Sequence, residues 1–380
     1  MSIPSPILIL LTLTVASSCS VTREATVIAD STHLKFLGEY IVPHNQNFKG
    51  TTIGGLSGID YDPKKDIYYL ISDDRSDYNP ARFYEAKIII GNYKIDSVFF
   101  VDVKSLKDMH GNFFPNSKSD PYHTPDPEAL RYDPRKNIFL WSSEGERIVK
   151  PNKIVLEDPA VTEIDINGNY IDTFRLPPQL QMQVTEQGPR QNGVFEGLTF
   201  ANHYKTLFVN VEEPLYNDGP RAGLDDSTGI TRILKFSMAS KKPVAQYAYR
   251  IDPVAHAPAP SNAFEINGIP DILTVGKNKL IVLERSFSVG REACTIKVFL
   301  ADISSAENIN NITSLKDNPN VKFTTKKMLL NMDNLGIYID NIEGVTFGPK
   351  LPDGKSSLLF ISDNNFNPLQ KTQFLLFEIL

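Results

Sequence analysis

Acidic residues recur at matching positions along this chain of 380 residues. Each copy of a repeated unit opens on a short apolar strand with a polar residue at its start, and these residues are Ser57, Glu128, Glu196, Asp271 and Glu343. The next strand of each copy ends on further acids, which are Asp73, Asp74, Glu144, Glu212, Glu213, Glu284 and Asp363. Such carboxylates could hold a hard cation such as Ca²⁺ or Mg²⁺, or act directly as acids and bases. They could equally cap loop backbone and serve the fold alone.

Arginines stand close to the second set of acids, at Arg75, Arg82, Arg147 and Arg285. A guanidinium group could pair with the carboxylates or clamp a phosphate. Other chemistry is poorly represented in the sequence. His110, His123 and His256 are isolated and show none of the close spacings of zinc ligands. The chain has no Gly-x-Ser-x-Gly motif, which disfavours a serine esterase of the α/β-hydrolase type.

The repeated strands start 71, 68, 75 and 72 residues apart. A steady period built from short β-branched and aromatic runs predicts a propeller or a solenoid. Four strands fit into each period, but the fifth copy runs out of chain before its fourth strand. The segment Leu34–Val42 is predicted to supply that strand and to close the ring. We therefore expect an all-β propeller of five four-stranded blades, with six blades as the alternative.

The predicted connections fall into a short and a long class. Turns between first and second strands, such as 62–66 and 133–137, are tight. Loops between second and third strands, such as 145–160, and connections between blades, such as 104–127, are long. In an up-and-down blade both long classes emerge on one face, where binding usually takes place. Because first strands start and second strands end on that face, the acids should gather around one mouth of the central channel.

The N-terminus has the pattern of an export signal. An apolar run at 7–15 is followed by small residues and Cys19, as in the lipobox of bacterial lipoproteins. The run is too short to span a bilayer as a mature helix. We expect a signal peptide at 1–18, a lipidated Cys19 with a tether through residue 32, and one propeller domain at 33–380. The predicted location is the cell envelope, at the outer membrane or in the periplasm, with secretion as the alternative.

The overall composition is that of an ordinary soluble domain, with 41% hydrophobic and 22% charged residues. The formal net charge of −6 argues against nucleic acid as a partner. We expect a monomer whose only contact with a membrane is the lipid on Cys19. The second cysteine, Cys294, lies in an apolar strand pattern and is expected to be a buried, inert thiol.

Five segments of the chain together resemble one known family. They are Asp126–Leu130, Gly193–Leu198, Leu280–Arg285, Asn341–Val345 and Ser362–Phe366. In these segments the chain resembles the phytase-like domain family, also called "esterase-like activity of phytase", and the resemblance covers about residues 40–380. It implies a β-propeller, export from the cell and hydrolysis of phosphate esters assisted by Ca²⁺. The chain departs from the repeated pattern in the first unit, where Ser57 replaces the acid, and in the second, where Ala129 replaces the glycine.

The sequence and this resemblance lead to one main hypothesis, an exported hydrolase of phosphate esters that depends on a divalent metal. We expect catalytic roles for Glu196, Glu128 and Arg285. Substrate binding is assigned to Arg75, Arg147 and Asn364. The predicted ligands of Ca²⁺ are Glu128, Glu196, Asp271, Glu343, Asp363 and Asp73. Two alternatives remain open, a surface-anchored propeller that binds a ligand or protein without catalysis, and a Ca²⁺-dependent esterase of the lactonase type.

Overall fold

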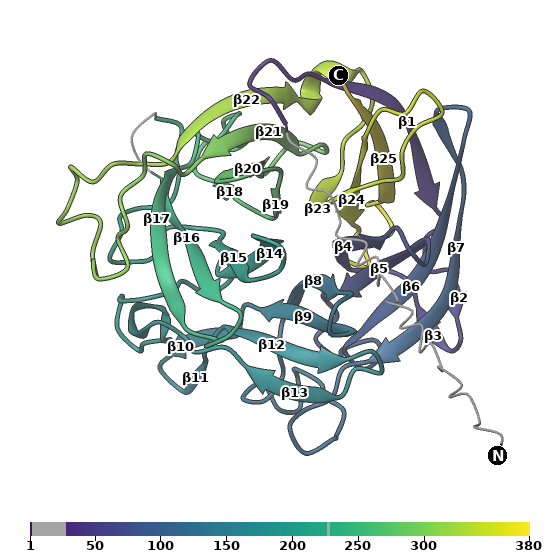
Figure 1. Cartoon of the computed structure of the whole chain (residues 1–380). Coiled ribbons are helices and arrows are strands. Elements are labelled where there is room, and N and C mark those ends of the chain that lie inside the picture. The colour runs from purple at the N-terminus through teal and green to yellow at the C-terminus, as the bar shows by residue number, and fades with distance from the viewer. Residues whose placement is uncertain (2–27, 226–228) are drawn as a thin grey trace.

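The protein folds as a β-propeller of five antiparallel blades around a central channel (Figure 1). The computed structural model describes Met1 and residues 28–225 and 229–380. The predicted signal peptide, Cys19 and most of the predicted tether lie outside these residues. Within the described part of the chain, no helix has the length and apolar character needed to cross a membrane.

The blades follow one another along the chain. The first contains β4 (Leu56–Asp62), β5 (Ile67–Ser72), β6 (Arg82–Gly91) and β7 (Lys94–Ser105). The second contains β8 (Pro127–Asp133), β9 (Ile138–Ser143), β12 (Ala160–Asp165) and β13 (Tyr170–Thr173). The third contains β14 (Phe195–Ala201), β15 (Thr206–Val211), β16 (Ile230–Ser237) and β17 (Pro243–Arg250). In the fourth, two short inner strands, β18 (Glu265–Gly268) and β19 (Ile272–Thr274), pair with β20 (Lys279–Ser288), which is followed by β21 (Thr295–Asp302) and β22 (Thr325–Asn331).

The fifth blade joins the two ends of the described chain. It contains β23 (Asn341–Phe347), β24 (Ser357–Asp363), β25 (Thr372–Ile379) and, from the start of the chain, β1 (Leu34–Val42). Strands β1 and β25 are antiparallel, and the rings of Phe36 and Phe377 lie 5.3 Å apart across the pair. The predicted closure and the count of five blades are confirmed.

Smaller elements lie in the connections. Two hairpins are formed by β2 (Asn47–Phe48) with β3 (Thr51–Thr52) and by β10 (Glu146–Lys150) with β11 (Lys153–Glu157). Two short 3₁₀ helices are η1 (Pro178–Leu180) and η2 (Met332–Leu335). Most of these elements belong to the long connections, so the fold keeps its added structure at one end of the channel.

Apolar side chains fill the spaces between neighbouring blades. One such core combines Ile59 of the first blade with Leu359 and Phe374 of the fifth. The inner strands approach one another closely around the channel, which explains the Glu-Gly pairs of the repeat. A Cβ atom on Gly197 would lie 2.6 Å from the Cα atom of Asp271 in the next blade. Glycine at this position therefore allows close packing around the channel.

The closing strand gives a direct test of the fold. A chain that starts at Asn45 would lack β1 and leave one edge of β25 unpaired. We expect this variant to lose cooperative unfolding and to aggregate, because an open sheet edge pairs with other chains. A chain that starts at Ile28 should unfold as the full chain does. Circular dichroism and gel filtration compare the two, and a monomeric, cooperatively unfolding chain from Asn45 would contradict the expectation.

Candidate active site at the long-loop mouth of the channel

The second strands end on charged residues at equivalent heights around the channel. The strand registers make the following positions equivalent: Asp73, Glu144, Glu212, Arg285 and Asp363. Four blades thus contribute a carboxylate, and the fourth blade contributes a guanidinium group. The sequence pattern predicts Glu284 as the acid of the fourth blade. Its side chain instead accepts hydrogen bonds from Tyr249 Oη, on the outer strand of the third blade, and from the backbone N–H of Asp252, just after that strand.

The inner strands add a second layer of acids at a local irregularity of the strand pairing. The equivalent positions are Ser57, Glu128, Glu196, Pro270 and Glu343. In the fourth blade, Pro270 falls in the break between β18 and β19, and Asp271 lies one position further along the inner strand. Asp271 therefore lies deeper in the channel than expected and does not join the carboxylates at the mouth.

Two groups of carboxylates have the spacing of a metal site. Asp126, Glu128 and Glu144 form one group, and Glu144, Glu196 and Glu212 form the other. Within each group one carboxylate oxygen of every residue lies within 4.8 Å of the others, and all five side chains are buried. Glu144 belongs to both groups. Its Oε2 atom is buried and has no hydrogen-bond partner among the described residues.

Burial and mutual repulsion make these carboxylates hard to ionise. Burial, followed by the charges of Asp126 and Glu212, raises the pKa of Glu144 to about 8. Burial and Glu128 raise the pKa of Glu196 well above its ordinary value. The pKa of Asp126 rises to about 6, mainly through burial, although Arg75 opposes the change. Carboxylates that repel one another in this way are suited to a site that a cation neutralises.

An arginine neutralises the other side of the mouth. Arg285 Nη2 lies 2.7 Å from Glu212 Oε1, and its Nη1 lies 3.0 Å from Glu343 Oε1. Burial alone would lower the pKa of Arg285, but Glu343 and Glu212 raise it well above its ordinary value. Its Nε atom is buried and has no partner among the described residues. Arg285 is therefore a cation held in place by two carboxylates, and its Nε–H remains available to donate a hydrogen bond.

The three predicted substrate-binding residues lie in different surroundings. Arg75 reaches the mouth, with Nη1 2.7 Å from Glu146 Oε2 and 3.7 Å from Asp126 Oδ2, and its Nε also lacks a partner in the described structure. Asn364 Oδ1 accepts the backbone N–H of Gly55 at 3.0 Å, so it holds a loop close to the mouth.

Arg147 is turned away from the carboxylates. It donates to the backbone carbonyls of Gln183, Val184 and Thr185 and lies over the ring of Tyr216. These contacts give it a role in holding the connection between β13 and β14. The structure thus brings Arg75 and Arg285 to the acids but leaves Arg147 outside this group.

The remaining predicted ligands lie on the first- and fifth-blade side of the mouth. Burial, then Asp363 and Glu343, raises the pKa of Asp73 well above its ordinary value. Burial raises the pKa of Glu343 to about 8 and that of Asp363 to about 6. These carboxylates face one another closely enough to interact. They are not part of either group with metal-ligand spacing.

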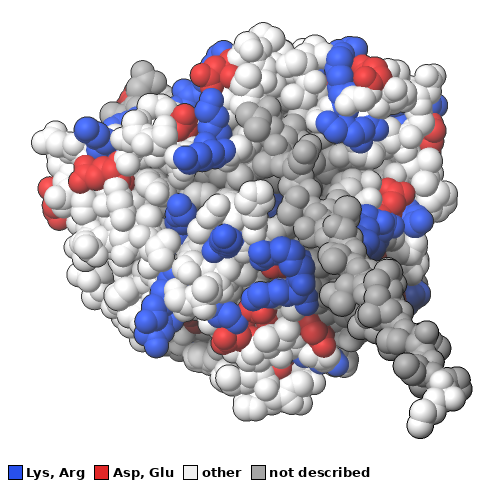
Figure 2. Space-filling view, in the orientation of Figure 1, with Lys and Arg blue, Asp and Glu red and all other residues white. Residues whose placement is uncertain are grey.

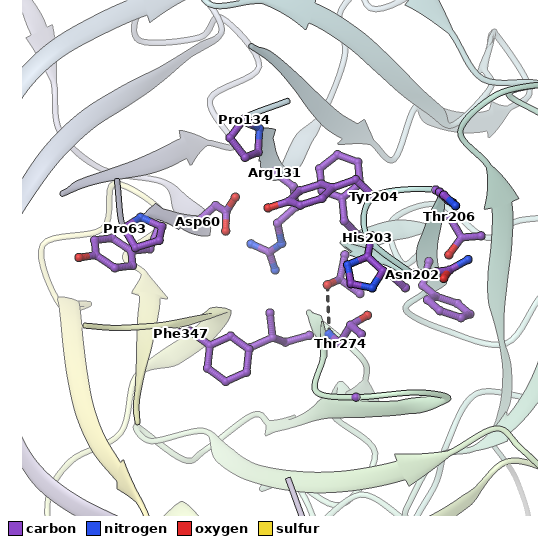
Figure 3. Close-up of a pocket in the computed structure, with 18 of the residues that line it drawn as sticks. Asp60, Pro63, Arg131, Pro134, Asn202, His203, Tyr204, Thr206, Thr274 and Phe347 are labelled. Atoms are coloured by element: carbon purple, nitrogen blue, oxygen red, sulfur yellow. Dashed lines mark hydrogen bonds between the residues drawn. The ribbon is translucent and has the colours of Figure 1, made fainter. Parts of the chain in front are cut away.

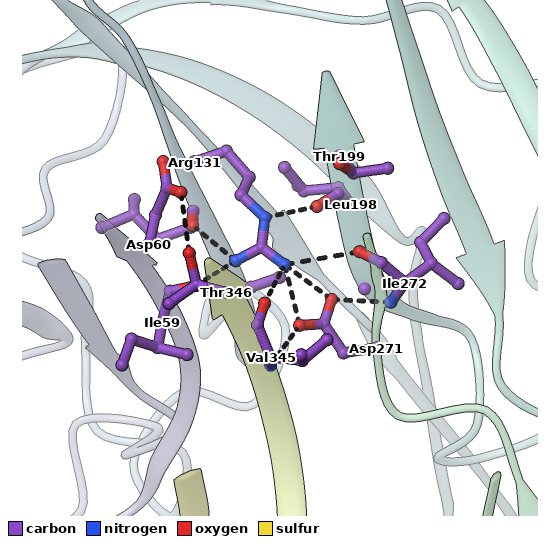
Figure 4. Close-up of polar contacts among 12 residues, drawn as sticks. Ile59, Asp60, Arg131, Leu198, Thr199, Asp271, Ile272, Val345 and Thr346 are labelled. Atoms are coloured by element: carbon purple, nitrogen blue, oxygen red, sulfur yellow. Dashed lines mark hydrogen bonds and ion pairs between the residues drawn. The ribbon is translucent and has the colours of Figure 1, made fainter. Parts of the chain in front are cut away.

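A buried arginine, Arg131, lies between the inner strands of the blades and contacts several of them (Figure 4). Arg131 Nη2 lies 2.9 and 2.7 Å from the two carboxylate oxygens of Asp271, and its Nε donates to the carbonyl of Leu198 at 2.7 Å. The same side chain also donates to the carbonyls of Ile59 and Val345. Arg131 therefore ties together residues of all five blades and separates the acidic mouth from the other end of the channel.

Three of the clustered acids are not among the metal ligands predicted from the sequence. They are Asp126, Glu144 and Glu212. The sequence pattern identifies Glu144 and Glu212 as acids at the ends of second strands, and their equivalent positions in the repeat are the signal that could place them together. Asp126 lies two residues before Glu128, on the connection from β7, and the backbone N–H of Glu144 donates to its carbonyl at 3.1 Å, which places it beside the end of β9 within the second blade.

The raised pKa values predict how stability depends on pH. A carboxyl group with a raised pKa stabilises the fold below its unfolded value of about 4.5, and this contribution is lost as pH rises through about 8. We expect the melting temperature of the calcium-free protein to fall by about 4 °C or more from pH 5 to pH 8. Added Ca²⁺ should raise it more at pH 8 than at pH 5. Differential scanning calorimetry measures both effects, and a flat profile with no response to Ca²⁺ would contradict them.

Comparisons with solved structures give only distant likenesses. An endo-arabinase from Bacteroides thetaiotaomicron is 12% identical, with a TM-score of 0.39, over 85% of this chain and 93% of that one. An α-L-arabinofuranosidase from Lactobacillus brevis is 11% identical, with a TM-score of 0.45, over 85% and 90%. An exo-β-1,3-galactanase from Phanerochaete chrysosporium is 8% identical, with a TM-score of 0.46, over 90% and 64%. These likenesses carry no argument about activity.

A comparison with curated proteins finds no match. The profile of one family, described as "Phytase-like: Esterase-like activity of phytase", matches residues 51–366. The match runs from the first blade to the fifth and includes every carboxylate of the acidic mouth. The chain belongs to this phytase-like family.

Proposed function

We propose that the protein is a divalent-metal-dependent hydrolase of phosphate esters that acts at the acidic mouth of the channel. One observation carries the proposal: Glu144 belongs to both carboxylate groups and keeps a buried oxygen without a partner. A buried, unpaired carboxylate oxygen is costly unless a ligand satisfies it. A donor set made only of carboxylate oxygens suits Ca²⁺ rather than zinc or copper.

The residues that would hold the metal follow from the two groups. Asp126, Glu128 and Glu144 would bind on one side, and Glu196 and Glu212 would complete the other side with the shared Glu144. A bound Ca²⁺ polarises a phosphoryl oxygen and makes water a better nucleophile. A cation bound to these five carboxylates would also explain why they can be buried close together.

The surrounding arginines supply binding for the phosphate. Arg75 and Arg285 each keep a buried Nε–H without a partner in the described structure, and this group can donate to a phosphoryl oxygen. Their remaining contacts to Glu146, Glu212 and Glu343 hold both guanidinium groups in place. They would thus orient the phosphoryl group and stabilise the charge that develops on it during the reaction.

We assign the proton acceptor for the attacking water to Glu196. A carboxylate oxygen of Glu196 lies within 4.8 Å of those of Glu144 and Glu212, so Glu196 would lie beside a water bound to a metal held there, and burial and the neighbouring Glu128 raise its pKa above the ordinary value. The buried position on β14 also keeps the carboxylate fixed. Glu128 would then act only as a metal ligand, together with Asp126 and Glu144.

Calorimetric titration with Ca²⁺, combined with turnover assays, tests the proposal. We expect Ca²⁺ to bind, and hydrolysis of p-nitrophenyl phosphate to stop in EGTA and resume when Ca²⁺ is restored. Absence of Ca²⁺ binding would overturn the proposal. Turnover of p-nitrophenyl acetate or a lactone without turnover of the phosphate ester would favour a lactonase-type esterase. Binding of Ca²⁺ with no turnover of any ester would favour a propeller that only binds a ligand or protein.

A further inference from the structure

The end of the channel opposite the acids opens into a cavity of about 900 Å³ (Figure 3). The tight turns between first and second strands surround it, and we call it the short-loop pocket. Its lining includes Asp60, Pro134, His203, Thr274 and Phe347, which come from all five blades. Arg131 forms its floor, so a ligand in this pocket cannot reach the carboxylates at the other mouth.

The walls of the short-loop pocket are largely aromatic and apolar. They contain Tyr61, Phe200, Tyr204, Leu273 and Phe347, together with prolines of the turns. Binding sites for small organic molecules commonly have this volume and this kind of lining. The walls therefore suit a ligand with an apolar or aromatic body.

The rim of the pocket is positively charged. The basic residues of its lining, apart from Arg131 in the floor, are Arg135, Lys205, Lys235, Lys277 and Lys350. Asp60 is the one acid among the described lining residues, and it is buried and accepts the backbone N–H of Tyr132 at 2.9 Å. Lys and Arg side chains also surround the central part of the face shown in Figure 2. This charge is opposite to that of the acidic mouth.

The cations of the rim differ in their contacts: Lys350 donates to Ser356 Oγ at 2.7 Å and Lys235 lies over the ring of Phe208, whereas Lys205 and Lys277 remain available to a ligand. Arg135 is held by Asp133 and by the carbonyls of His203 and Tyr204, so its donors are already used. Lys205 and Lys277 are exposed, and no ion pair involves them within the described residues. They lie on neighbouring turns of the third and fourth blades, and both line the short-loop pocket.

We propose that the short-loop pocket binds a small amphipathic anion, with a carboxylate, phosphate or sulfonate group at Lys205 and Lys277 and an apolar body among Phe200, Tyr204 and Phe347. The basic rim attracts the charged group, and the aromatic walls remove the body from water. This second site is independent of the proposed hydrolase activity, because Arg131 and Asp271 separate the two ends of the channel.

A matched pair of fluorescent probes tests both parts of the proposal. The anion 1-anilinonaphthalene-8-sulfonate and the neutral N-phenyl-1-naphthylamine share one aromatic skeleton and differ by the sulfonate group. We expect the sulfonate to bind the folded protein saturably at one site, about tenfold or more tightly than the neutral probe. Equal affinity for the two probes would overturn the anionic part of the proposal.

Charge reversal at the rim locates the site. The double variant Lys205→Glu/Lys277→Glu should weaken binding of the sulfonate about tenfold or more. The control variant Lys64→Glu/Lys136→Glu makes the same charge change on exposed turns of the same face, outside the pocket, and should leave binding unchanged. Equal losses in the two variants would overturn the assignment of the site, and thermal unfolding of each verifies that it is folded.

Ile28 and Asp30 lie beside the pocket, which provides one more control. The backbone N–H of Ile28 donates to the carbonyl of Val275, and Lys279 pairs with Asp30, next to the pocket-lining turn at 276–278. The titration should give the same affinity for a chain that starts at Ser20 and for one that starts at Ile28. Binding only to the shorter chain would overturn the proposal, because the N-terminal segment itself would then be the occupant.

Discussion

Replacing Glu144 with glutamine should strongly weaken Ca²⁺ binding and ester turnover while making the metal-free protein more stable. Glu144 is shared by both carboxylate groups, so the substitution removes one ligand charge from each. We expect the affinity for Ca²⁺ to fall about 100-fold or more, because affinity depends strongly on the number of charged ligands. The stability should change in the opposite direction, since one buried, repelling charge is removed.

Because Ca²⁺ affinity should fall while the stability of the metal-free protein rises, this variant is more informative than one that only loses activity. Glutamine preserves the shape of the side chain and an Oε1 that can still accept the backbone N–H groups of Gly193 and Val194. The melting temperature at pH 8 without Ca²⁺ should therefore rise by about 2 °C or more. If Glu144 were purely structural, the same change would lower the melting temperature and leave Ca²⁺ binding as it was.

Two further variants separate charge from other effects. Glu85 is half-buried on β6, and burial followed by Asp102 raises its pKa, but it lies outside the acidic mouth. Glu85→Gln should leave both Ca²⁺ affinity and turnover unchanged. Glu144→Asp keeps the charge on a shorter side chain and should retain part of the affinity. Calorimetric titration and turnover of p-nitrophenyl phosphate measure all three proteins.

The fold could be predicted from the sequence because the blades have the same order of apolar strands and turns. Every sheet needs an apolar strand near the channel, a tight turn and a second apolar strand, so residues of similar type recur at a constant spacing. The closing role of Leu34–Val42 followed from a fifth repeat that lacked its fourth strand, and the pairing of β1 with β25 confirms it. Neither inference required knowledge of contacts between side chains.

The details of the site depend on strand register, which residue types alone do not determine. Adjacent strand residues face opposite sides, so choosing Glu284 rather than Arg285 reverses the charge assigned to the fourth blade. In the structure Arg285 faces Glu212 and Glu343, whereas Glu284 contacts Lys326 and Tyr249.

The position of Asp271 illustrates a second limit. Its acidic side chain matched the repeat by type, but Pro270 interrupts the inner strand just before it. Proline cannot donate to the strand pairing and often marks such breaks. Pro270 was therefore a signal in the sequence for the break in the inner strand of the fourth blade. The partner of Asp271, however, is Arg131, which lies 140 residues away in the chain, and only the assembled ring brings them together.

Arg131→Met should be among the most destabilising single substitutions in the protein. Arg131 is buried, pairs with both oxygens of Asp271 and donates to carbonyl groups of neighbouring blades. Methionine fills similar space but leaves Asp271 as a buried carboxylate without its cation. Removing one partner of a buried ion pair commonly costs about 3–5 kcal/mol. Burial already raises the pKa of Asp271 to about 6 while Arg131 opposes the rise, so the variant should lose most stability at high pH.

A double-mutant cycle distinguishes this pair from a general packing defect. Asp271→Asn retains an oxygen that can accept the backbone N–H of Val345, so it should cost less than Arg131→Met. In the double variant Arg131→Met/Asp271→Asn no charge is left unpaired, and the loss should be smaller than the sum of the two single losses by about 1 kcal/mol or more. Urea unfolding at pH 8 measures the free energies. Additive losses would show that Arg131 acts through its volume and its carbonyl contacts rather than through Asp271.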